Sequence, residues 1–567
     1  MSAKFASTNI PVVWLAVLAI AIGLVLRGVQ YAAGASLWLD EIALVKAIES
    51  NNLFDLLVQP LPFDQLAPKG FLLVEKLVSL AFGASDYALR LFPFVCSLVA
   101  LLAFARLAAF VLPGAGAGVA MLLFAMAAPL VSFSAIVKQY SSDVTAAILL
   151  TLLACELAMR PLNARKAWFL AIAGAVLPWF SQGVALVVAG VALPILVRAG
   201  RPDAQWRSRA LIVGIWVASA LAMTAVAVAS MSAETRQYMH AFWAGGFPPG
   251  SFAGAFAAAW PWQNVRLLFG FGAQASLAYP FAPAYATLAT IGCGVLWVRQ
   301  RRTAAILIGP IIATLGAAVV GQYPFMDRLI LFLVPALILA IAAAVAALYE
   351  YVARYSQPTA VLVAACLVLP TAYPVAATPP PYRIEPVKTV LQQLQVAHRP
   401  GDAVYVYYGA APGVSAYAEK FGLSEADYAV GGCHRGDSRR YLEELDNFRG
   451  RARVWLILAH ALPRYRERDD ILAYLDAIGT REQLIRAEAR SADWDPQPAE
   501  AVLYDLSAPE RPGEVLAGTF ALTGPASQEP ATRCGRGPLG MVRSEFECLD
   551  SPAQGCRMVE TAAAQPH

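Results

Sequence analysis

Long apolar runs recur along the chain from residue 10 to residue 376 and decide what it can fold into. The hydrocarbon core of a bilayer is about 30 Å thick and is crossed by roughly 20 apolar residues in a helix. Reading the runs in this way predicts about eleven membrane-spanning helices, several of them short. The expected spans are 10–31, 89–112, 116–135, 144–159, 168–179, 184–197, 210–230, 284–298, 304–320, 329–349 and 359–376.

The composition excludes most other classes of protein. Hydrophobic residues make up 58% of the chain and charged residues 14%, which indicates lipid rather than water as the solvent. The net charge of +4 is small for 567 residues and provides no basic surface for nucleic acid. The first apolar run is too long for a cleavable signal peptide, so we expect it to remain as a span.

Basic residues predict the orientation, because lysine and arginine in short loops are retained in the cytoplasm. With Lys4 inside, every second loop lies on the same side, and the later ones are basic. These basic residues are Arg160, Arg165, Lys166, Arg198, Arg201, Arg207, Arg209, Arg299, Arg301, Arg302 and Arg354. We therefore expect a protein of the plasma (inner) membrane with a cytoplasmic N-terminus and an extracytoplasmic C-terminal segment.

A domain boundary is expected at residues 379–381, three prolines at which hydrophobicity falls and charge density rises. We assign residues 1–378 to a transmembrane domain with an outer loop at 32–88, and residues 379–567 to a soluble extracytoplasmic domain. Short runs rich in Val, Tyr and Leu predict strands in this second domain, with helical patterns between them, so we expect an α/β fold. The expected elements are strands at 403–408, 454–459 and 501–506 and a helix at 471–478.

Four of the eight cysteines lie in the expected soluble domain. An even set in an oxidising compartment favours two disulfides, with the pairing left open. A metal site is the weaker alternative, because no CxxC spacing occurs and only His434 lies near a cysteine. The disulfide candidates are Cys433, Cys534, Cys548 and Cys556.

Two adjacent carboxylates, Asp40 and Glu41, follow the first span directly. An ionised carboxylate at the mouth of a helical bundle can accept a proton from a hydroxyl or hold a divalent cation. The simpler alternative is a solvated helix start, where acidic side chains are stabilised by the helix dipole. The segment 42–82 has helical amphipathic spacing but too much charge to span, so we expect two helices lying on the outer leaflet.

Two further polar segments interrupt the apolar pattern. In the first, at 138–143, Lys138 is a candidate phosphate ligand and Asp143 a candidate second acid, because ionisable groups in membrane segments are costly and are commonly functional. In the second, at 321–328, Arg328 can give bidentate contacts to the same anion. An exposed turn and a neighbouring Asp327–Arg328 pair are the alternatives without a ligand. In the long outer loop that follows 230, His240 is a weaker candidate for a base or ligand.

These segments resemble the integral-membrane (GT-C type) polyprenyl-phosphate-dependent glycosyltransferases, which include protein O-mannosyltransferases and the aminoarabinose and rhizobial core-sugar transferases. The pair at 40–41 matches the family's first outer-loop motif, and 67–76 looks like the loop that follows it. Lys138-Gln139-Tyr140 is similar to the family's basic-x-Tyr element, and 323–328 resembles its late outer turn. The chain departs from the pattern at Ile136, where many relatives carry glutamate. Either Asp143 takes that role or the second acid is dispensable.

The resemblance implies a sugar donor on a polyprenyl phosphate, membrane lipid around the protein, and a glycan, lipid or protein acceptor. Transfer would invert the anomeric centre, with Asp40 as general base and Lys138 and Arg328 at the leaving phosphate, assisted by Lys69. The resemblance leaves a divalent metal cofactor open. The other site residues that we single out are Glu41 and Asp143 for catalysis and Gln139, Tyr140, Tyr323 and His240 for substrate binding.

Two other classes of protein remain as alternatives. A flippase or transporter of lipid-linked sugars would also place ionisable residues in an apolar bundle, but such proteins commonly show internal repeats and charge near the midplane. We find no such repeat, and the polar segments gather at one membrane face. A sensor or scaffold with a ligand-binding α/β domain would leave the 40–41 pair and Lys138 without a role.

Overall fold

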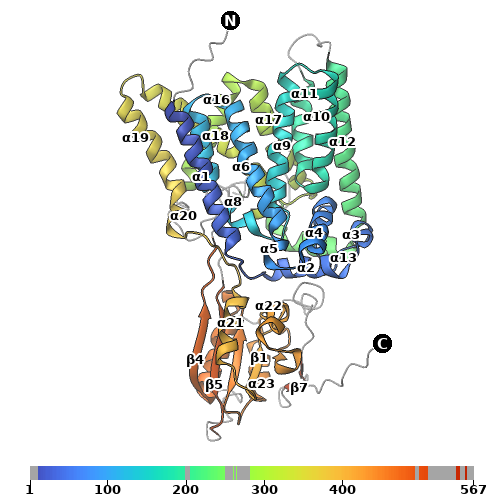
Figure 1. Ribbon diagram of the computed structural model, residues 1–567, viewed down its shortest axis with the longest axis vertical. Helices are drawn as coiled ribbons and strands as arrows, with labels where there is room; N and C mark the ends of the chain where they lie inside the picture. The colour runs from blue at the N-terminus through green and yellow to red at the C-terminus, as the bar shows by residue number, and fades with distance from the viewer. Residues whose placement is uncertain are drawn as a thin grey trace.

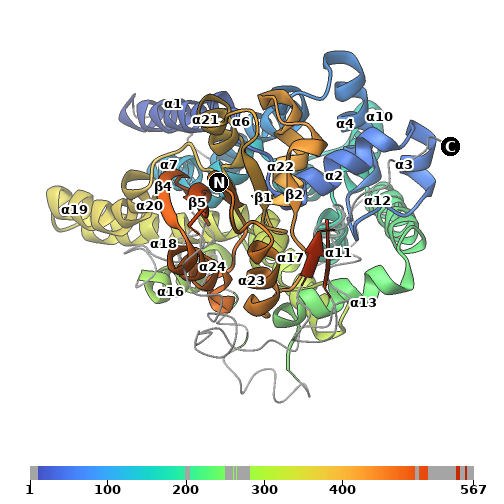
Figure 2. The ribbon, with the colours of Figure 1, turned by 90° about the horizontal axis from the view of Figure 1, so that it is seen from below.

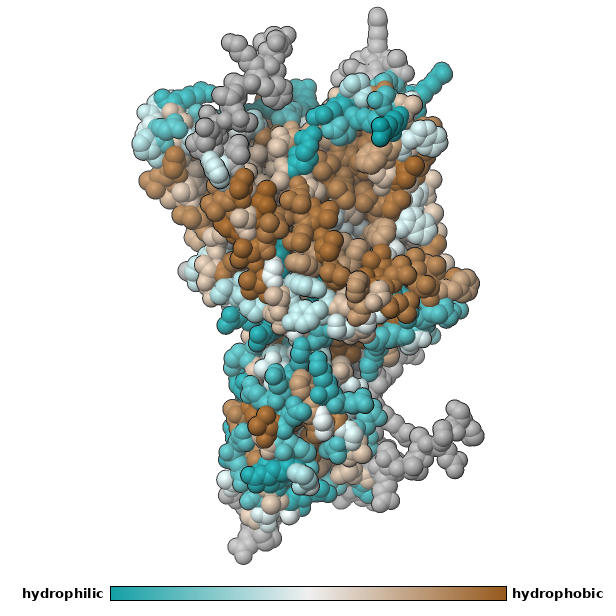
Figure 3. Space-filling model, viewed as in Figure 1, coloured by the Kyte–Doolittle hydropathy of each residue, from teal (hydrophilic) through white to brown (hydrophobic). Residues whose placement is uncertain are grey.

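The computed structural model describes residues 10–197, 205–249, 260, 264, 281–491, 497–508, 545–548 and 556–558. A bundle of helices carries an α/β domain at the end opposite to the N-terminus (Figure 1). An apolar belt surrounds the bundle on the face seen in Figure 3, while the α/β domain is largely hydrophilic. The expected fold class, a helical polytopic membrane protein with a C-terminal α/β domain, is confirmed.

Seven helices of the described residues are long and apolar enough to cross a membrane, or eight if the bent pair Ala115–Met126 and Ala128–Ala135 forms one span. The expected count of eleven is not confirmed. Two of the expected spans, 168–179 and 184–197, correspond to helices of 13 residues each, α10 and α11, which reach only about 20 Å at 1.5 Å per residue. The bundle helices are α1 (Ile10–Ala32), α6 (Leu91–Val111), α7 (Ala115–Met126), α8 (Ala128–Ser132), α9 (Tyr140–Met159), α10 (Ala164–Val176), α11 (Val184–Leu196), α12 (Trp206–Ala229), α16 (Ala282–Arg299), α17 (Arg301–Val319), α18 (Val334–Val352) and α19 (Gln357–Val368).

Short helices close the end of the bundle that faces the α/β domain (Figure 1). The outer loop contains three of them where two were expected, because the segment before the prolines at 60, 62 and 68 is itself divided by a break at 51–52. These helices are α2 (Leu39–Ser50), α3 (Leu53–Val58) and α4 (Lys69–Phe82), followed by α5 (Asp86–Leu89) and, after α12, by α13 (Ala233–Phe242).

The α/β domain is built on one mixed sheet with the strand order β2-β1-β3-β5-β4. β1 is parallel to β2 and β3, whereas β5 is antiparallel to β3 and β4. The three expected strands are confirmed as β1, β3 and β5, and the expected helix as α24. The elements are α21 (Val387–Ala397), β1 (Ala403–Val406), α22 (Ala411–Tyr417), β2 (Ala429–Val430), α23 (Ser438–Asp446), β3 (Val454–Leu458), α24 (Glu467–Ile478), β4 (Thr480–Ala487) and β5 (Ala499–Asp505), with a hairpin of β6 (Phe546–Cys548) and β7 (Cys556–Met558).

Helices cover both faces of this sheet. Because side chains alternate along a strand, Val404 and Val406 face one hydrophobic core with α21 and α22, while Tyr405 faces a second core with α23 and α24. The first core also includes Leu37, Ile42 and Val45 of the outer loop, and Leu89 and Val137 of the bundle. The α/β domain and the membrane domain therefore share one hydrophobic core.

Cys433 and Cys556 are each disulfide-bonded, which agrees with the expected disulfides in this domain. Cys534 and the side chain of Cys548 lie outside the described residues. The four cysteines of the bundle are free thiols.

Glycine allows α11 and α17 to approach closely. A Cβ atom at Gly309 would lie 2.1 Å from the carbonyl oxygen of Gly190, so only a residue without a side chain fits there. Farther along α17, a Cβ atom at Gly316 would meet nothing within 4 Å.

We predict that Gly309→Ala destabilises the bundle by about 1–3 kcal/mol through overpacking against backbone, which cannot move aside. Gly316→Ala on the same helix is the matched control and should leave stability unchanged or slightly raised, because alanine favours helix. Thermal unfolding of both variants in detergent measures the difference. Equal melting temperatures for the two variants would contradict the close approach of α11 and α17.

Candidate active site

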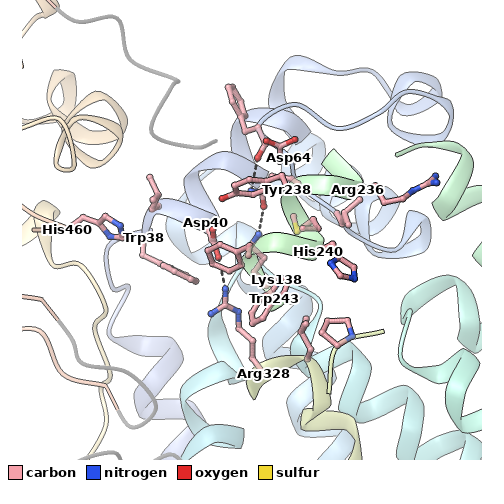
Figure 4. Close-up of a pocket in the computed structure, with 18 of the residues that line it drawn as sticks. Trp38, Asp40, Asp64, Lys138, Arg236, Tyr238, His240, Trp243, Arg328 and His460 are labelled. Atoms are coloured by element: carbon pink, nitrogen blue, oxygen red, sulfur yellow. Dashed lines mark hydrogen bonds and ion pairs between the residues drawn. The ribbon is translucent and has the colours of Figure 1, made fainter. Parts of the chain in front are cut away.

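A cavity of about 1050 Å³ lies between the end of the helical bundle and the α/β domain (Figure 4). Its lining comes from the outer loop, from the segments around 138–143, 231–247 and 321–329, and from loops of the α/β domain. Seen from below the molecule, the α/β domain covers the middle of the bundle end, with α2 and α13 beside it (Figure 2). The cavity is therefore bounded by both domains.

Asp40 lines this cavity from the first turn of α2. Its Oδ2 atom lies 3.1 Å from the Arg328 guanidinium, which comes from the start of the 3₁₀ segment Asp327–Leu333. The Arg328 side chain is 4% exposed, against 24% for Asp40. The rings of Trp38 and Trp243 lie 5.5 and 5.0 Å from the guanidinium carbon. Arg328 is thus held in place by aromatic rings, while Asp40 stays open to the cavity.

Lys138 lies in an irregular stretch between the 3₁₀ turn Phe133–Ala135 and α9. Its ammonium group contacts the Gln65 side-chain oxygen in the cavity wall. Burial lowers the pKa of Lys138, and the carboxylate of Asp40 opposes that shift. A buried cation with a neutral partner is a favourable site for an incoming anion.

Glu41 does not line the cavity, although it adjoins Asp40 in sequence. Successive residues of a helix point about 100° apart, so the two carboxylates face different surroundings. Glu41 is 1% exposed and forms an ion pair of 2.9 Å with Arg90, which is 4% exposed. Its other oxygen accepts a hydrogen bond of 2.7 Å from the backbone N–H of Val137. Glu41 is placed to hold the structure together rather than to meet a substrate.

Five other residues singled out from the sequence line the cavity. Asp143 and Gln139 each have a buried side-chain oxygen without a hydrogen-bond partner among the described residues. The five residues are Gln139, Tyr140, Asp143, His240 and Tyr323.

Lys69 is the exception among the predicted cations. It is buried at the start of α4, where its ammonium group donates a hydrogen bond of 3.0 Å to the carbonyl oxygen of Leu56. Burial lowers the pKa of Lys69. The structure does not place it in the cavity wall, so it does not join Lys138 and Arg328.

Sequence reasoning missed several cavity residues. Asp64 has a φ of +52° and accepts a hydrogen bond of 2.7 Å from Thr235, which joins the outer loop to α13. Its acidity alone did not distinguish it from other loop carboxylates. No sequence signal connected the α/β domain to the site, yet this domain supplies a strongly basic part of the wall. The charged or titratable residues it contributes are His434, Arg435, Asp437, Arg440, His460 and Arg464.

The α/β domain also binds the segment that leads into α2. The Tyr417 hydroxyl accepts a hydrogen bond of 2.8 Å from the backbone N–H of Leu37 and donates one of 2.7 Å to Asp86. The ammonium group of Lys388 donates to the carbonyl oxygen of Gly34 at 2.8 Å and forms an ion pair with Asp86 at 2.7 Å. These contacts fix the backbone that precedes Asp40.

One group of three potential metal ligands, His434, Glu444 and Cys556, lies within 4.8 Å in the described part of the chain. The sulfur of Cys556 belongs to a disulfide and is therefore no thiolate ligand. His434 and Glu444 already contact each other at 2.9 Å. The arrangement of these three residues is better explained by a hydrogen bond between His434 and Glu444 than by a metal site.

No family model and no curated protein match the sequence. Solved structures match over much of the chain at low identity. They include an Archaeoglobus fulgidus oligosaccharyltransferase in complex with Zn and sulfate, with 12% identity over 78% of this chain and 67% of that chain, and a TM-score of 0.43. Archaeoglobus fulgidus AglB, with an inhibitory peptide and a dolichol-phosphate, matches at 12% identity over 83% and 73%, with a TM-score of 0.44. Cupriavidus metallidurans ArnT bound to undecaprenyl phosphate matches at 14% identity over 88% and 98%, with a TM-score of 0.43.

We predict that Glu41→Gln destabilises the protein by about 3–5 kcal/mol, because it leaves the Arg90 guanidinium buried without a counter-charge. The matched control is Glu350→Gln, which breaks an ion pair of 2.7 Å with Arg299 that is 46% exposed on both sides. The control should cost about 1 kcal/mol or less. Thermal unfolding in detergent at fixed pH compares the two variants. A Glu41→Gln protein as stable as the control would contradict the structural role of Glu41.

Proposed function

We propose that the protein is a glycosyltransferase that moves a sugar from a polyprenyl-phosphate donor to an acceptor hydroxyl, with inversion at the anomeric carbon. The observation that carries the proposal is the arrangement of three residues from distant parts of the chain. Asp40, Lys138 and Arg328 line one cavity, at the end of an apolar bundle, and Arg328 bonds Asp40 directly.

The two cations suit a lipid phosphate. Lys138 and Arg328 are both buried in the bundle end, where the surrounding dielectric is low and attraction to an anion is strong. A guanidinium group gives two parallel hydrogen bonds to phosphate oxygens, and an ammonium group adds a compact charge. The polyprenyl chain would remain in the bilayer, along the apolar belt seen in Figure 3.

Donor binding would also free the general base. In the structure Arg328 is paired with Asp40, and a phosphate at Arg328 competes for that pairing. The Asp40 carboxylate then accepts the proton of the acceptor hydroxyl as its oxygen attacks the anomeric carbon. The bond between that carbon and the phosphate oxygen breaks, and the phosphate leaves with its electron pair, stabilised by Lys138 and Arg328.

Glu41 and Lys69 receive structural roles in this proposal. Glu41 orients α2 through Arg90 and Val137, and Lys69 holds α3 to α4 through Leu56. Asp143 remains a candidate for the second acid, since it is one of the residues that line the cavity. No step needs a metal ion, and the described residues do not gather a ligand set at Asp40.

The orientation of the protein in the membrane is also part of the proposal. The loops at 160–166 and 299–302 lie at the end of the bundle away from the α/β domain (Figure 1), and both are basic. Basic loops remain in the cytoplasm, so the cavity and the α/β domain would face the extracytoplasmic side of the plasma (inner) membrane. The acceptor would then be a glycan, lipid or protein outside the cytoplasm.

We expect Asp40→Asn to remain folded and to lower sugar transfer by about 10²–10⁴-fold, because the amide cannot accept the proton. The assay uses the purified protein in lipid nanodiscs with radiolabelled undecaprenyl-phosphate sugars and an extract of envelope glycolipids. Asp476→Asn is the control, since Asp476 lies in the α/β domain outside the cavity wall and is paired with Arg481 at 2.6 Å. Full transfer by Asp40→Asn would remove Asp40 as the base.

We expect Arg328→Met and Lys138→Met each to weaken inhibition by undecaprenyl phosphate by about 10-fold or more, through loss of a charge-assisted hydrogen bond of about 1.5–3 kcal/mol. Arg299→Met, at the opposite end of the bundle, should leave inhibition unchanged. Unaltered inhibition in both cavity variants would place the donor phosphate elsewhere.

The alternative is a flippase or transporter of lipid-linked sugars, which polar residues gathered in a cavity at one end of the bundle support less well. Sealed vesicles distinguish the two. Movement of the donor across the bilayer with the sugar–phosphate bond intact would favour transport, whereas release of undecaprenyl phosphate would favour transfer.

A further inference from the structure

His460 enters the cavity wall from the α/β domain, at the turn that follows β3. Its φ of +53° is a conformation that non-glycine residues rarely adopt, and it places the imidazole at the cavity (Figure 4). Sequence reasoning did not single it out, because a histidine after a strand has no distinguishing pattern.

A carboxylate fixes the state of the His460 ring. The Nδ1 atom lies 2.6 Å from the Oε1 atom of Glu385, whose side chain is 7% exposed. The Oε2 atom of Glu385 accepts a hydrogen bond of 3.2 Å from the backbone N–H of Leu39, the residue before Asp40. An ionised carboxylate only accepts hydrogen bonds, so Nδ1 carries the hydrogen. In the neutral ring, the lone pair of Nε2 is then available.

Among the described residues, the His460 side chain bonds Glu385 through Nδ1, and no bond is made by Nε2. A lone pair at the cavity wall accepts a hydrogen bond from a donor such as a hydroxyl group. The donor phosphate is provided for by Lys138 and Arg328 of the bundle. His460 instead comes from the α/β domain, on the aqueous side of the cavity, where a polyhydroxylated acceptor would enter.

We propose that His460 binds a hydroxyl group of a carbohydrate acceptor through Nε2, and that Glu385 is the positioning residue that aligns both His460 and the start of α2. The inference rests on the proposed glycosyl transfer and adds the acceptor class and its binding residue. Glu385 connects the two halves of the site, because it bonds the acceptor-side imidazole and the backbone next to the general base.

Two substitutions distinguish the roles of the two ring nitrogen atoms of His460. In His460→Asn, the side-chain amide nitrogen takes the place of Nδ1 and keeps the hydrogen bond to Glu385, but nothing replaces Nε2. In His460→Gln, the amide oxygen reaches the place of Nε2 and can accept a hydroxyl, but the bond to Glu385 is lost. His398→Asn, in the same domain and outside the cavity wall, is the control.

The experiment measures how the transferred sugar is divided between two acceptors. Transfer to water gives free sugar, and transfer to an added alcohol gives a glycoside. The purified protein in nanodiscs is given a radiolabelled undecaprenyl-phosphate sugar with increasing methyl β-D-glucopyranoside, and free sugar and new glycoside are counted. We expect His460→Asn to lower the glycoside-to-free-sugar ratio by about 10-fold, equivalent to about 1.4 kcal/mol, with hydrolysis unchanged. His460→Gln should retain more of this ratio, and His398→Asn should match the wild type.

The outcomes distinguish this inference from the function on which it rests. A wild-type protein that consumes donor, with an unchanged ratio in His460→Asn, would overturn the role of His460 and leave the transferase proposal standing. A ratio lowered only in His460→Gln would make His460 a purely structural residue. A wild-type protein that consumes no donor would overturn both proposals.

Discussion

The site depends on a buried carboxylate that is not itself in the cavity. Glu41 bonds the Arg90 guanidinium and the backbone N–H groups of Trp38 and Val137, so it joins the outer loop, the start of α6 and the segment that carries Lys138. Burying two charges costs several kcal/mol of desolvation free energy. The attraction between Glu41 and Arg90 offsets this cost but adds little net stability. What the pair provides is a defined geometry, because any other arrangement would leave a charge buried without a partner. Asp40 directly precedes Glu41 in the chain, and Lys138 directly follows Val137, whose backbone Glu41 binds. Glu41 therefore fixes the positions of both residues.

A second constraint comes from the α/β domain. Its core continues into Leu37, Ile42 and Val137, and Tyr417 and Lys388 bond the backbone before α2. This domain is therefore a wall of the cavity and a support for the backbone that carries Asp40, rather than an appendage on a complete membrane domain. In the proposed reaction, a site between two domains gives each substrate its own side, with the bundle for the lipid and the α/β domain for the acceptor.

The sequence predicted much of the fold, because helices and strands follow directly from the spacing and hydrophobicity of neighbouring residues. The strands at 403–406 and 454–458 are continuous apolar runs, as expected where helices cover both faces of a sheet. Strand β4 was not predicted, since its exposed charged residues resemble a loop. The count of eleven spans is not confirmed, because helices such as α10 and α11, with 13 residues each, are shorter than a full span.

For the site, the sequence by itself determined which segments were costly to bury. Charge in an apolar bundle needs a partner or a ligand, so Asp40, Lys138 and Arg328 were identifiable from their positions alone. Only the tertiary structure decided which of these groups meet. It separated Glu41 from Asp40 by a helical rotation and kept Lys69 away from the cavity. It also brought His460 to the cavity wall from a domain far along the chain, with Glu385 bonded to its imidazole. Contacts between residues hundreds of positions apart depend on the packing of whole elements, and no local pattern specifies them.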